Sequence, residues 1–294
     1  MKKTLITLIL GLCACTSAFA YGRYAHAAIV YIAEQNLTPT AAKNIKKLTG
    51  NRSLVYYASY CDNYKKQMIV DLGFDPDNDR RYNTLPHTFS IDTATETPVP
   101  SIRVGDSYVV TLIPFVKEAE EWLKTNKYEA ADSVAFSKLM ILVHMIGDLH
   151  CMGHLREYHL LEPEKARFYY TVNIHGENII FHKWMDDIHI TERHSWSYSD
   201  IAHSLDGYSN EDHKDMAKGT VDDWAIDVFQ NAKKYLIPFK EGSTLSKKDC
   251  DNIRKASEEL LVKAGYRMAE VLNRTFDPKY NKRQQRIGQN QSKK

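Results

Sequence analysis

The residues best suited to chemistry lie between His144 and His154, a stretch that holds three histidines and one aspartate in eleven residues. His144 and Asp148 are four positions apart, so on a helix their side chains leave the same face about one turn apart. A single histidine on an apolar helix is usually a core residue, but this density of imidazole and carboxylate groups is typical of a first-row metal site, zinc above all. We therefore predict a metal site at the end of a buried helix that turns at Gly153.

Other histidines and aspartates extend this ligand set. His182 and Asp186 repeat the four-residue spacing. With the first pair and His154, and with His26, Asp62 and His87, the candidate ligands number eight. Because a zinc ion usually takes four ligands, eight side chains indicate two or three ions with a bridging carboxylate. Multinuclear zinc in a secreted protein favours hydrolysis of a phosphate ester, since paired ions make hydroxide near neutral pH and neutralise charge on the attacking and leaving oxygens.

The first twenty residues resemble a targeting segment rather than part of the fold. Lys2 and Lys3 precede an apolar run over 5–12, and Ala18-Phe19-Ala20 is a cleavage site of the A-x-A type. We predict a secretory signal peptide at 1–20 that is cut after Ala20, and hence a secreted or periplasmic protein. Lipidation of Cys15 is an alternative. No other stretch is apolar for long enough to span a membrane, so no membrane association is expected.

Cleavage there would leave 274 residues with 37 basic and 37 acidic side chains. A neutral chain gives no reason to expect a broad basic face for nucleic acid, so any affinity for phosphate must be local. Clustered zinc ions would supply it. Three cysteines would remain, at positions 61, 151 and 250, which is too few for a disulfide scaffold; Cys61 with Cys151 is the pair to test.

The elements that must position these ligands are mostly helices. Apolar spacing and capping residues predict helices at 27–33, 41–48, 54–68, 114–126, 130–148, 224–236 and 246–273. Thr38 and Pro39 are expected to begin the second helix and Gly50 to end it. Residues 75–83 and 90–106 are expected to be irregular, and 168–181 to form a small β-hairpin. The prediction is one mainly α domain over 21–275, followed by a basic, disordered tail at 276–294.

The order and spacing of these residues resemble the secreted single-strand-specific zinc nucleases of fungi and plants, the S1/P1 nucleases, whose fold is shared with zinc-dependent phospholipases C. The matching blocks are Tyr21-Gly22 with His26, Ala58-Ser59-Tyr60-Cys61-Asp62, His87, the stretch from His144 to His154, His182-Lys183-Trp184-Met185-Asp186, Trp224-Ala225 and residues 264–273. The resemblance covers nearly all of the mature chain.

Carried over residue by residue, this resemblance implies three zinc ions. The first would be held by Asp62, His87, His144 and Asp148; the second by His26, the far side of Asp148, and the amine and carbonyl of Tyr21; the third by His154, His182 and Asp186. A free α-amine at Tyr21 is then required, which argues against lipidation at Cys15.

The resemblance also implies a mechanism and a substrate. A hydroxide between the paired zincs, which Asp62 and Asp148 hold, would attack phosphorus in line while the third zinc stabilises the departing 3′ oxygen, leaving a 5′-phosphate. Lys65 would steady charge on the phosphate, unless it is an ordinary solvated lysine, and His150 would orient a ligand from the second shell. The expected enzyme is an endonuclease on single-stranded DNA and RNA and a 3′-nucleotidase, with nucleic acid or nucleotides as partners and no protein partner evident.

The substrate contacts depart from the family pattern. Tyr21 replaces Trp, Cys151-Met152-Gly153 stands for Gln-Pro-Leu, Thr88 stands for a base-stacking aromatic, and Ala166-Arg167-Phe168 stands for Gly-Gly-Asn. Stacking and hydrogen bonding hold single strands. Phe89, Phe168 or Tyr64 are therefore candidates for a replacement stacking surface.

Two other functions remain open. One is a phospholipase C or another phosphodiesterase on the same scaffold, although phospholipases place the early histidine further from the N-terminus and use Glu where Asp186 stands. The other is a non-catalytic metal-binding or adhesion protein, which the completeness of the ligand set disfavours.

Overall fold

The computed structural model describes residues 22–74, 85–104, 107–157, 168–191 and 197–282. The predicted signal peptide, Tyr21, the loop at 75–83, Ala166-Arg167 and the last part of the predicted tail lie outside the described residues. The fold is mainly helical with small sheets, as predicted. Among the described residues, no helix has both the length and the apolar character needed to cross a membrane.

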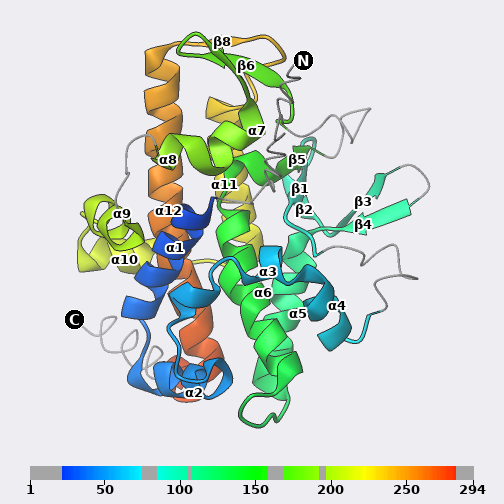
Figure 1. Ribbon diagram of the computed structural model, residues 1–294, viewed down its shortest axis with the longest axis vertical. Coiled ribbons are helices and arrows are strands. Elements are labelled where there is room, and N and C mark those ends of the chain that lie inside the picture. Colours follow the sequence, from blue (N-terminus) through cyan, green and yellow to red (C-terminus); the bar gives the residue numbers. More distant parts are fainter. Residues whose placement is uncertain (1–21, 75–84, 105–106, 158–167, 192–196, 283–294) are drawn as a thin grey trace, which may run out of the picture.

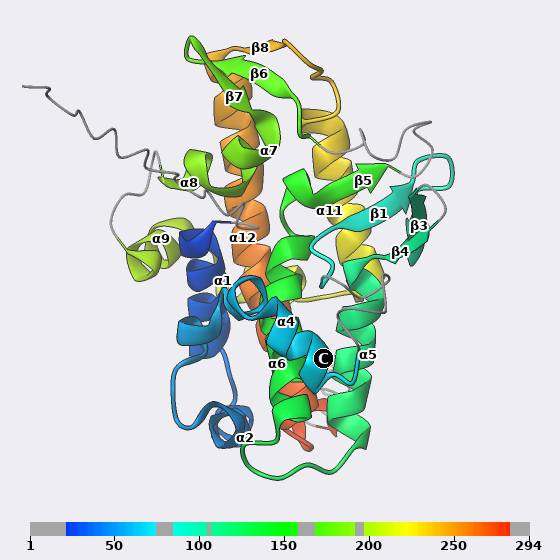
Figure 2. The ribbon, with the colours of Figure 1, turned by 45° about the vertical axis from the view of Figure 1, so that its right-hand side comes forward.

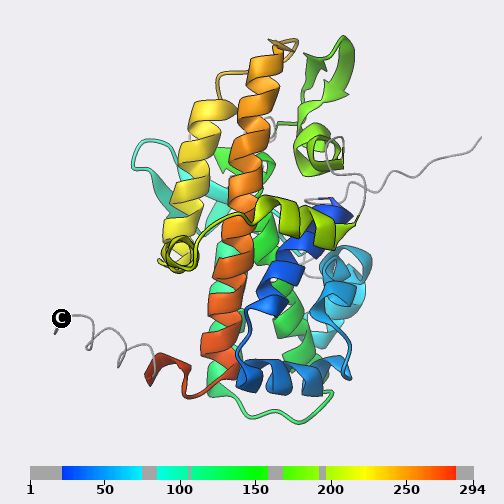
Figure 3. The ribbon, with the colours of Figure 1, turned by 90° about the vertical axis from the view of Figure 1, so that its left-hand side faces the viewer.

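Two helices form the centre of the fold. α12 (Lys247–Phe276) runs along the long axis of the molecule, and α6 (Ser133–Leu149) lies beside it (Figures 1 and 3). α1 (Arg23–Gln35) packs against both, and α5 (Leu112–Thr125) packs along α6 (Figure 2). Almost every residue of α6 is buried, because other elements cover it on all sides. The metal-ligand candidates on α6 therefore lie in the interior.

One helix has the predicted capping residues at both of its ends. α2 (Pro39–Thr49) begins after Thr38, whose hydroxyl accepts a hydrogen bond from the amide of Ala41, and ends at Gly50 in a left-handed conformation. α11 (Val221–Tyr235) and α12 each begin with a reciprocal capping box, as does α10 (Asn210–Met216). α9 (Tyr198–Leu205) completes the layer that covers α1.

The single helix predicted over 54–68 is wrong. The chain forms a 3₁₀ turn at Leu54–Tyr57, then the short α3 (Tyr60–Asn63), then α4 (Lys65–Asp71). The break comes at Tyr64, whose backbone lies outside the helical region (φ −126°, ψ 30°). Apolar periodicity continues through this break, which is why the pattern alone predicted one helix.

The predicted hairpin is present. β6 (Thr171–Ile174) pairs antiparallel with β7 (Glu177–Ile180), and β8 (Thr244–Leu245) adds to β6 in parallel. The hairpin lies at one end of the molecule, above α7 (Phe181–Lys183) (Figure 1).

The expectation of irregular structure at 90–106 is also wrong. β1 (Phe89–Asp92), β2 (Thr97–Val99) and β3 (Ser101–Val104) lie there, and β4 (Ser107–Val110) pairs with β3. Sequence patterns miss such strands because each is only three or four residues long and prolines interrupt them. Here Pro98 is tolerated because β2 lies at a sheet edge.

One strand pairing positions the site. β1 pairs in parallel with β5 (Leu155–Glu157), and Phe89 is the register partner of Leu155. His87 and His154 stand immediately before these two strands, so the pairing brings two histidines that are far apart in sequence to the same edge of the sheet.

Candidate metal centre

Asp148 is the residue around which the site is built. It lies in the last turn of α6 and is completely buried, and Nε2 of His144, one turn earlier, lies 3.4 Å from its Oδ2. Nδ1 of His144 donates a hydrogen bond of 2.9 Å to the carbonyl of Ala58, which leaves Nε2 directed at the carboxylates. The predicted helical pair is thus formed.

His26 reaches the same carboxylate from α1. Its Nε2 lies 3.2 Å from Oδ1 of Asp148, and its ring stacks on that of His144 with centroids 4.2 Å apart. Gly147 makes room for this ring, because a Cβ atom there would lie 2.7 Å from Nδ1 of His26. The glycine in the His144 stretch therefore has a packing role that the sequence pattern does not reveal.

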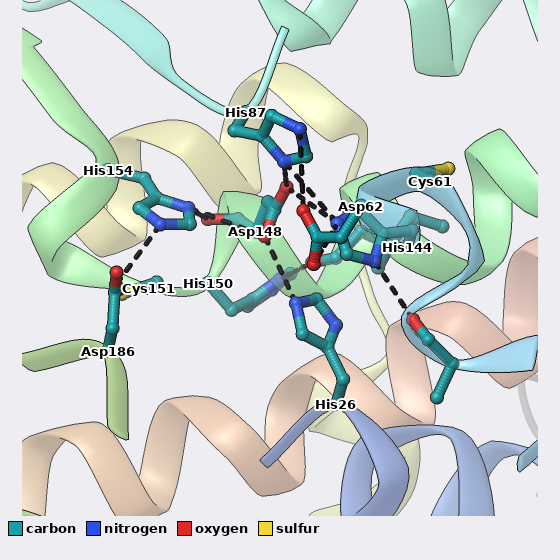
Figure 4. A network of polar contacts seen from close by, with 12 residues as sticks. His26, Cys61, Asp62, His87, His144, Asp148, His150, Cys151, His154 and Asp186 are labelled. Atoms are coloured by element: carbon teal, nitrogen blue, oxygen red, sulfur yellow. Dashed lines mark hydrogen bonds and ion pairs between the residues drawn. The ribbon is translucent and has the colours of Figure 1, made fainter. Parts of the chain in front are cut away.

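Asp62 and His87 complete the group from the other side (Figure 4). Nδ1 of His87 lies 2.8 Å from Oδ2 of Asp148, and its Nε2 lies 3.6 Å from Oδ1 of Asp62. Oδ2 of Asp62 lies 3.6 Å from Nε2 of His144. The two oxygens of Asp148 consequently face different partners, His26 on one side and His87 with His144 on the other.

A second group adjoins the first. Nε2 of His154 lies 3.2 Å from Oδ1 of Asp186, and Nε2 of His182 lies 2.9 Å from Oδ2 of Asp186. His182 belongs to α7 and Asp186 to the π-helical turn Trp184–Ile188, which keeps both side chains on one face. His154 joins the two groups, since its Nδ1 donates to the backbone carbonyl of Asp148 at 3.1 Å.

Burial and crowding shift the pKa values of these residues. Burial and the charge of Asp148 raise the pKa of Asp62, and burial holds the pKa of His144 well below its usual value. Burial also tends to raise the pKa of Asp148, but the neighbouring imidazoles outweigh it and hold that pKa well below its usual range. Burial opposes protonation of His154, yet the carboxylates of Asp148 and Asp186 raise its pKa to about 9. The carboxylates thus favour positive charge at this position.

Several buried ligand atoms have no hydrogen-bond partner. Within the part of the chain that the structure describes, these atoms include both carboxylate oxygens of Asp62 and Nε2 of His87. A buried polar atom without a partner is unfavourable unless something else satisfies it. Three groups of side chains have ligand atoms close enough to share an ion: His26, His144 and Asp148; Asp62, His87 and His144; Cys151, His154 and Asp186. This donor set fits zinc.

A comparison with protein-family models gives a match to the S1/P1 nucleases over residues 21–277. The chain belongs to the S1/P1 nuclease family. The family is zinc-dependent and secreted, and membership makes this protein a phosphodiesterase-type hydrolase with nucleic acid as its class of substrate. A comparison with curated proteins finds none that matches at a significant level.

Within this nuclease, the predicted ligands in the described residues come together as two adjoining groups. They are His26, Asp62, His87, His144, Asp148, His154, His182 and Asp186. Tyr21, the ninth predicted ligand, lies outside the described residues. Lys65 stands at the edge of the cluster, with Nζ 3.9 Å from Oδ1 of Asp62 and about a third of its side chain exposed.

Two secondary expectations do not agree with the structure, and the cysteine pair that the sequence left to test is not formed. Phe89 is fully buried in β1 and Phe168 is 6% exposed, so neither ring can stack on a base. His150 contacts no predicted ligand in the contacts described; its Nδ1 donates to the carbonyl of Ile146, and Nη1 of Arg267 donates to its Nε2 at 2.9 Å. Cys61 and Cys151 are free thiols, since the first points toward the carbonyl of Met140 and the second toward Asp186.

Two further candidate site residues, Tyr169 and Cys151, were not predicted from the sequence. Tyr169 is 50% exposed, and its ring lies 4.2 Å from that of His182. Phe168 is buried in the core, whereas the next residue, Tyr169, turns outward. The Cys151 thiol lies 3.4 Å from Oδ1 of Asp186. The position of Cys151 between His144 and His154 is the sequence feature that could have indicated a role for it in the site.

Proposed function

We propose that this protein is a secreted endonuclease and 3′-nucleotidase that cleaves single-stranded DNA and RNA, leaves 5′-phosphate ends and uses three zinc ions. The observation that carries the proposal is the placement of Asp148 between His26 on one oxygen and His87 with His144 on the other. A carboxylate approached from both sides by imidazoles is suited to bridge two ions, and His154, His182 and Asp186 stand ready for a third.

In this proposal Asp62, His87, His144 and Asp148 hold one ion, and His26 with the other oxygen of Asp148 holds its partner. The amine and carbonyl of Tyr21 complete the ligand set of this second ion. In support, the amide of Gly22 donates a hydrogen bond to the carbonyl of Asp186, so the chain enters α1 beside the cluster. Cleavage after Ala20 would free the α-amine of the residue that precedes Gly22, and we therefore propose that the signal peptide must be removed for full metal binding.

Zinc bound here would supply a Lewis acid that activates water and neutralises charge on the phosphate. The protein's own contribution is to hold the ligand side chains in one orientation. Hydrogen bonds from Nδ1 of His144, His154 and His182 to backbone carbonyls direct each Nε2 toward the cluster. Lys65 is a partly exposed cation at the rim, and we assign it the role of steadying negative charge on the phosphate.

A tyrosine-lined pocket beside the cluster supports a nucleic-acid substrate. The cavity has a volume of about 640 Å³, and we call it the tyrosine pocket; its aromatic lining is Tyr56, Tyr60, Tyr64 and Tyr198. Tyr60 and Tyr64 stack with centroids 4.5 Å apart, and Tyr64 is 53% exposed. Ala58 also lines the pocket, and its carbonyl accepts a hydrogen bond from Nδ1 of His144, which connects the pocket to the metal ligands. Stacked, exposed rings are the surface on which single-stranded bases bind.

The charge of the pocket separates the two candidate substrates. An aromatic pocket could also hold the choline group of a phospholipid, since quaternary ammonium groups bind aromatic rings. Arg23 lines the same pocket. Its positive charge opposes choline and favours a phosphate-bearing strand, and on this observation we rank nucleic acid above phosphatidylcholine.

The test uses the protein beginning at Tyr21, loaded with zinc, with single-stranded DNA and a short-chain phosphatidylcholine as parallel substrates. We expect cleavage of the DNA to 5′-phosphate ends and no release of phosphocholine. Asp148→Asn, which keeps the size of the side chain, is the matched inactive control. Release of phosphocholine from intact lipid with DNA left whole would replace the nuclease proposal with the phospholipase one.

A further inference from the structure

The thiol of Cys151 faces the ligands of the third proposed ion. Cys151 is 1% exposed, and its Sγ lies 3.4 Å from Oδ1 of Asp186. The ligand atoms of Cys151, His154 and Asp186 all lie within 4.8 Å of one another. A thiolate is among the strongest protein ligands for zinc, so this thiol adds a donor to the two imidazoles and the carboxylate.

The spacings agree with four donors around one ion. With zinc–sulfur bonds of about 2.3 Å and zinc–nitrogen or zinc–oxygen bonds of about 2.1 Å, neighbouring donors of a tetrahedron lie roughly 3.4 to 3.6 Å apart. Sγ of Cys151 lies 3.4 Å and Nε2 of His154 lies 3.2 Å from Oδ1 of Asp186. Nε2 of His182 lies 2.9 Å from the other oxygen. Cys151 and His154 thus approach one oxygen of Asp186 and His182 approaches the other, so one ion shared by all four requires the carboxylate or His182 to rotate.

The turn after α6 holds the thiol in this place. The amide of Cys151 donates to the carbonyl of Asp148 at 3.1 Å, and the amide of His154 donates to the carbonyl of Cys151 at 3.0 Å. Gly153 lies between the donors: a Cβ atom there would stand 3.4 Å from Nδ1 of His182 and 3.5 Å from Sγ of Cys151. Its carbonyl also accepts the hydrogen bond from Nδ1 of His182. The sequence Cys151-Met152-Gly153 thus builds a turn in which sulfur and imidazole approach closely.

Cys61 provides the contrast. It is also buried and precedes the predicted ligand Asp62, but its Sγ donates to the carbonyl of Met140 at 3.4 Å. It therefore faces backbone, whereas Cys151 faces a ligand carboxylate. Proximity to the metal cluster in the sequence does not by itself direct a thiol toward it.

We propose that Cys151 is the fourth protein ligand of the ion held by His154, His182 and Asp186, which rests on the three-ion arrangement proposed above. On binding, the S–H bond breaks, a sulfur–metal bond forms and the proton passes to solvent. The site then has four protein donors, one of them soft sulfur. The sulfur donor favours zinc over harder divalent ions such as magnesium or manganese.

The first test is the absorption spectrum of the protein loaded with cobalt(II) in place of zinc. A thiolate bound to cobalt gives an intense near-ultraviolet charge-transfer band that imidazole and carboxylate ligands do not give. We expect this band in the unmodified protein, its loss in Cys151→Ser, and its retention in Cys61→Ser and Cys250→Ser, which are matched controls at the other two buried thiols. His182→Ala should also weaken the band, because it removes another ligand of the same ion.

A second measurement does not depend on any variant. X-ray absorption of the zinc-loaded protein should show one sulfur scatterer at about 2.3 Å, averaged over the bound ions. In a chelator competition, Cys151→Ser should also lower the affinity of the protein for the third ion by at least about tenfold. A fully loaded protein with no sulfur scatterer would overturn the proposal, as would a charge-transfer band that survives in Cys151→Ser.

The nuclease proposal and the Cys151 ligand proposal can be overturned independently of each other. Cleavage of single-stranded DNA by a fully loaded protein without sulfur ligation would sustain the nuclease and overturn the Cys151 ligand. Sulfur ligation in a protein that leaves DNA whole would sustain the ligand and overturn the nuclease.

Discussion

Gly147 and His26 are 121 positions apart in sequence, yet a Cβ atom on Gly147 would lie 2.7 Å from Nδ1 of His26. The imidazole cannot easily retreat, because its ring stacks on that of His144. The missing side chain at Gly147 is therefore what allows α1 to bring a ligand to Asp148 on α6.

Gly147→Ala tests this relationship. In an exposed helix interior the change would stabilise by up to about 1 kcal/mol, but here it should displace His26 and weaken zinc binding by at least about tenfold. Chelator competition measures the affinity. Gly207→Ala is the matched control, since a Cβ there meets nothing within 4 Å. Unchanged zinc affinity in Gly147→Ala would mean that His26 is not a ligand.

Lys65 should affect the rate and not the metal content. Its ammonium lies 3.9 Å from Asp62 and a third of the side chain is exposed, so solvent weakens its field. We expect Lys65→Met to lower kcat by about 10- to 100-fold, less than a fully enclosed oxyanion donor would cost, with zinc stoichiometry preserved. Lys65→Arg should recover most of the rate. Equal rates in Lys65→Met and the unmodified protein would identify Lys65 as an ordinary surface lysine.

The tyrosine pocket should affect long substrates more than short ones. Stacking of one base contributes roughly 1 to 3 kcal/mol, so Tyr64→Ala should raise KM for single-stranded DNA by about 5- to 150-fold. Hydrolysis of a 3′-mononucleotide, which need not reach the pocket, should change little. Tyr208→Ala removes another partly exposed tyrosine that does not line the pocket, and serves as control. Similar KM values in both variants would remove the pocket from the substrate path.

His150 should make the folded protein sensitive to acid. Burial, with the charge of Arg267, lowers its pKa to about 3, whereas an unfolded histidine has a pKa near 6.5. Between these values the unfolded chain takes up a proton that the folded chain does not, so stability falls as the pH drops from about 6.5 toward 3. His150→Gln retains an acceptor for Arg267 and should lose less stability over this range.

Urea unfolding at pH 7 and pH 5, with metal removed by chelator, measures the difference. His203→Gln, at an exposed histidine, is the control and should retain the pH dependence of the unmodified protein. An identical pH dependence in His150→Gln would show that this imidazole titrates normally in the folded state.

The sequence by itself determined the local pairs of ligands and most of the helices. His144 with Asp148, and His182 with Asp186, could be predicted because the helical repeat brings positions four apart to one face. The ends of α2 could be read from Thr38, Pro39 and Gly50, since capping depends on residues within one turn. The resemblance to the nuclease family supplied the assembly of these pairs with His26, Asp62 and His87.

Tertiary structure alone decided how distant segments meet. The register of Phe89 with Leu155 brings His87 and His154 to the same edge of a sheet, and neither strand was predicted, because a pairing across more than sixty residues leaves no local pattern. The same applies to the thiols: Cys61 and Cys151 both adjoin predicted ligands in sequence, yet only the turn around Gly153 directs one of them at Asp186. Local chemistry follows from spacing along the chain, whereas the direction in which a buried side chain points depends on everything that packs around it.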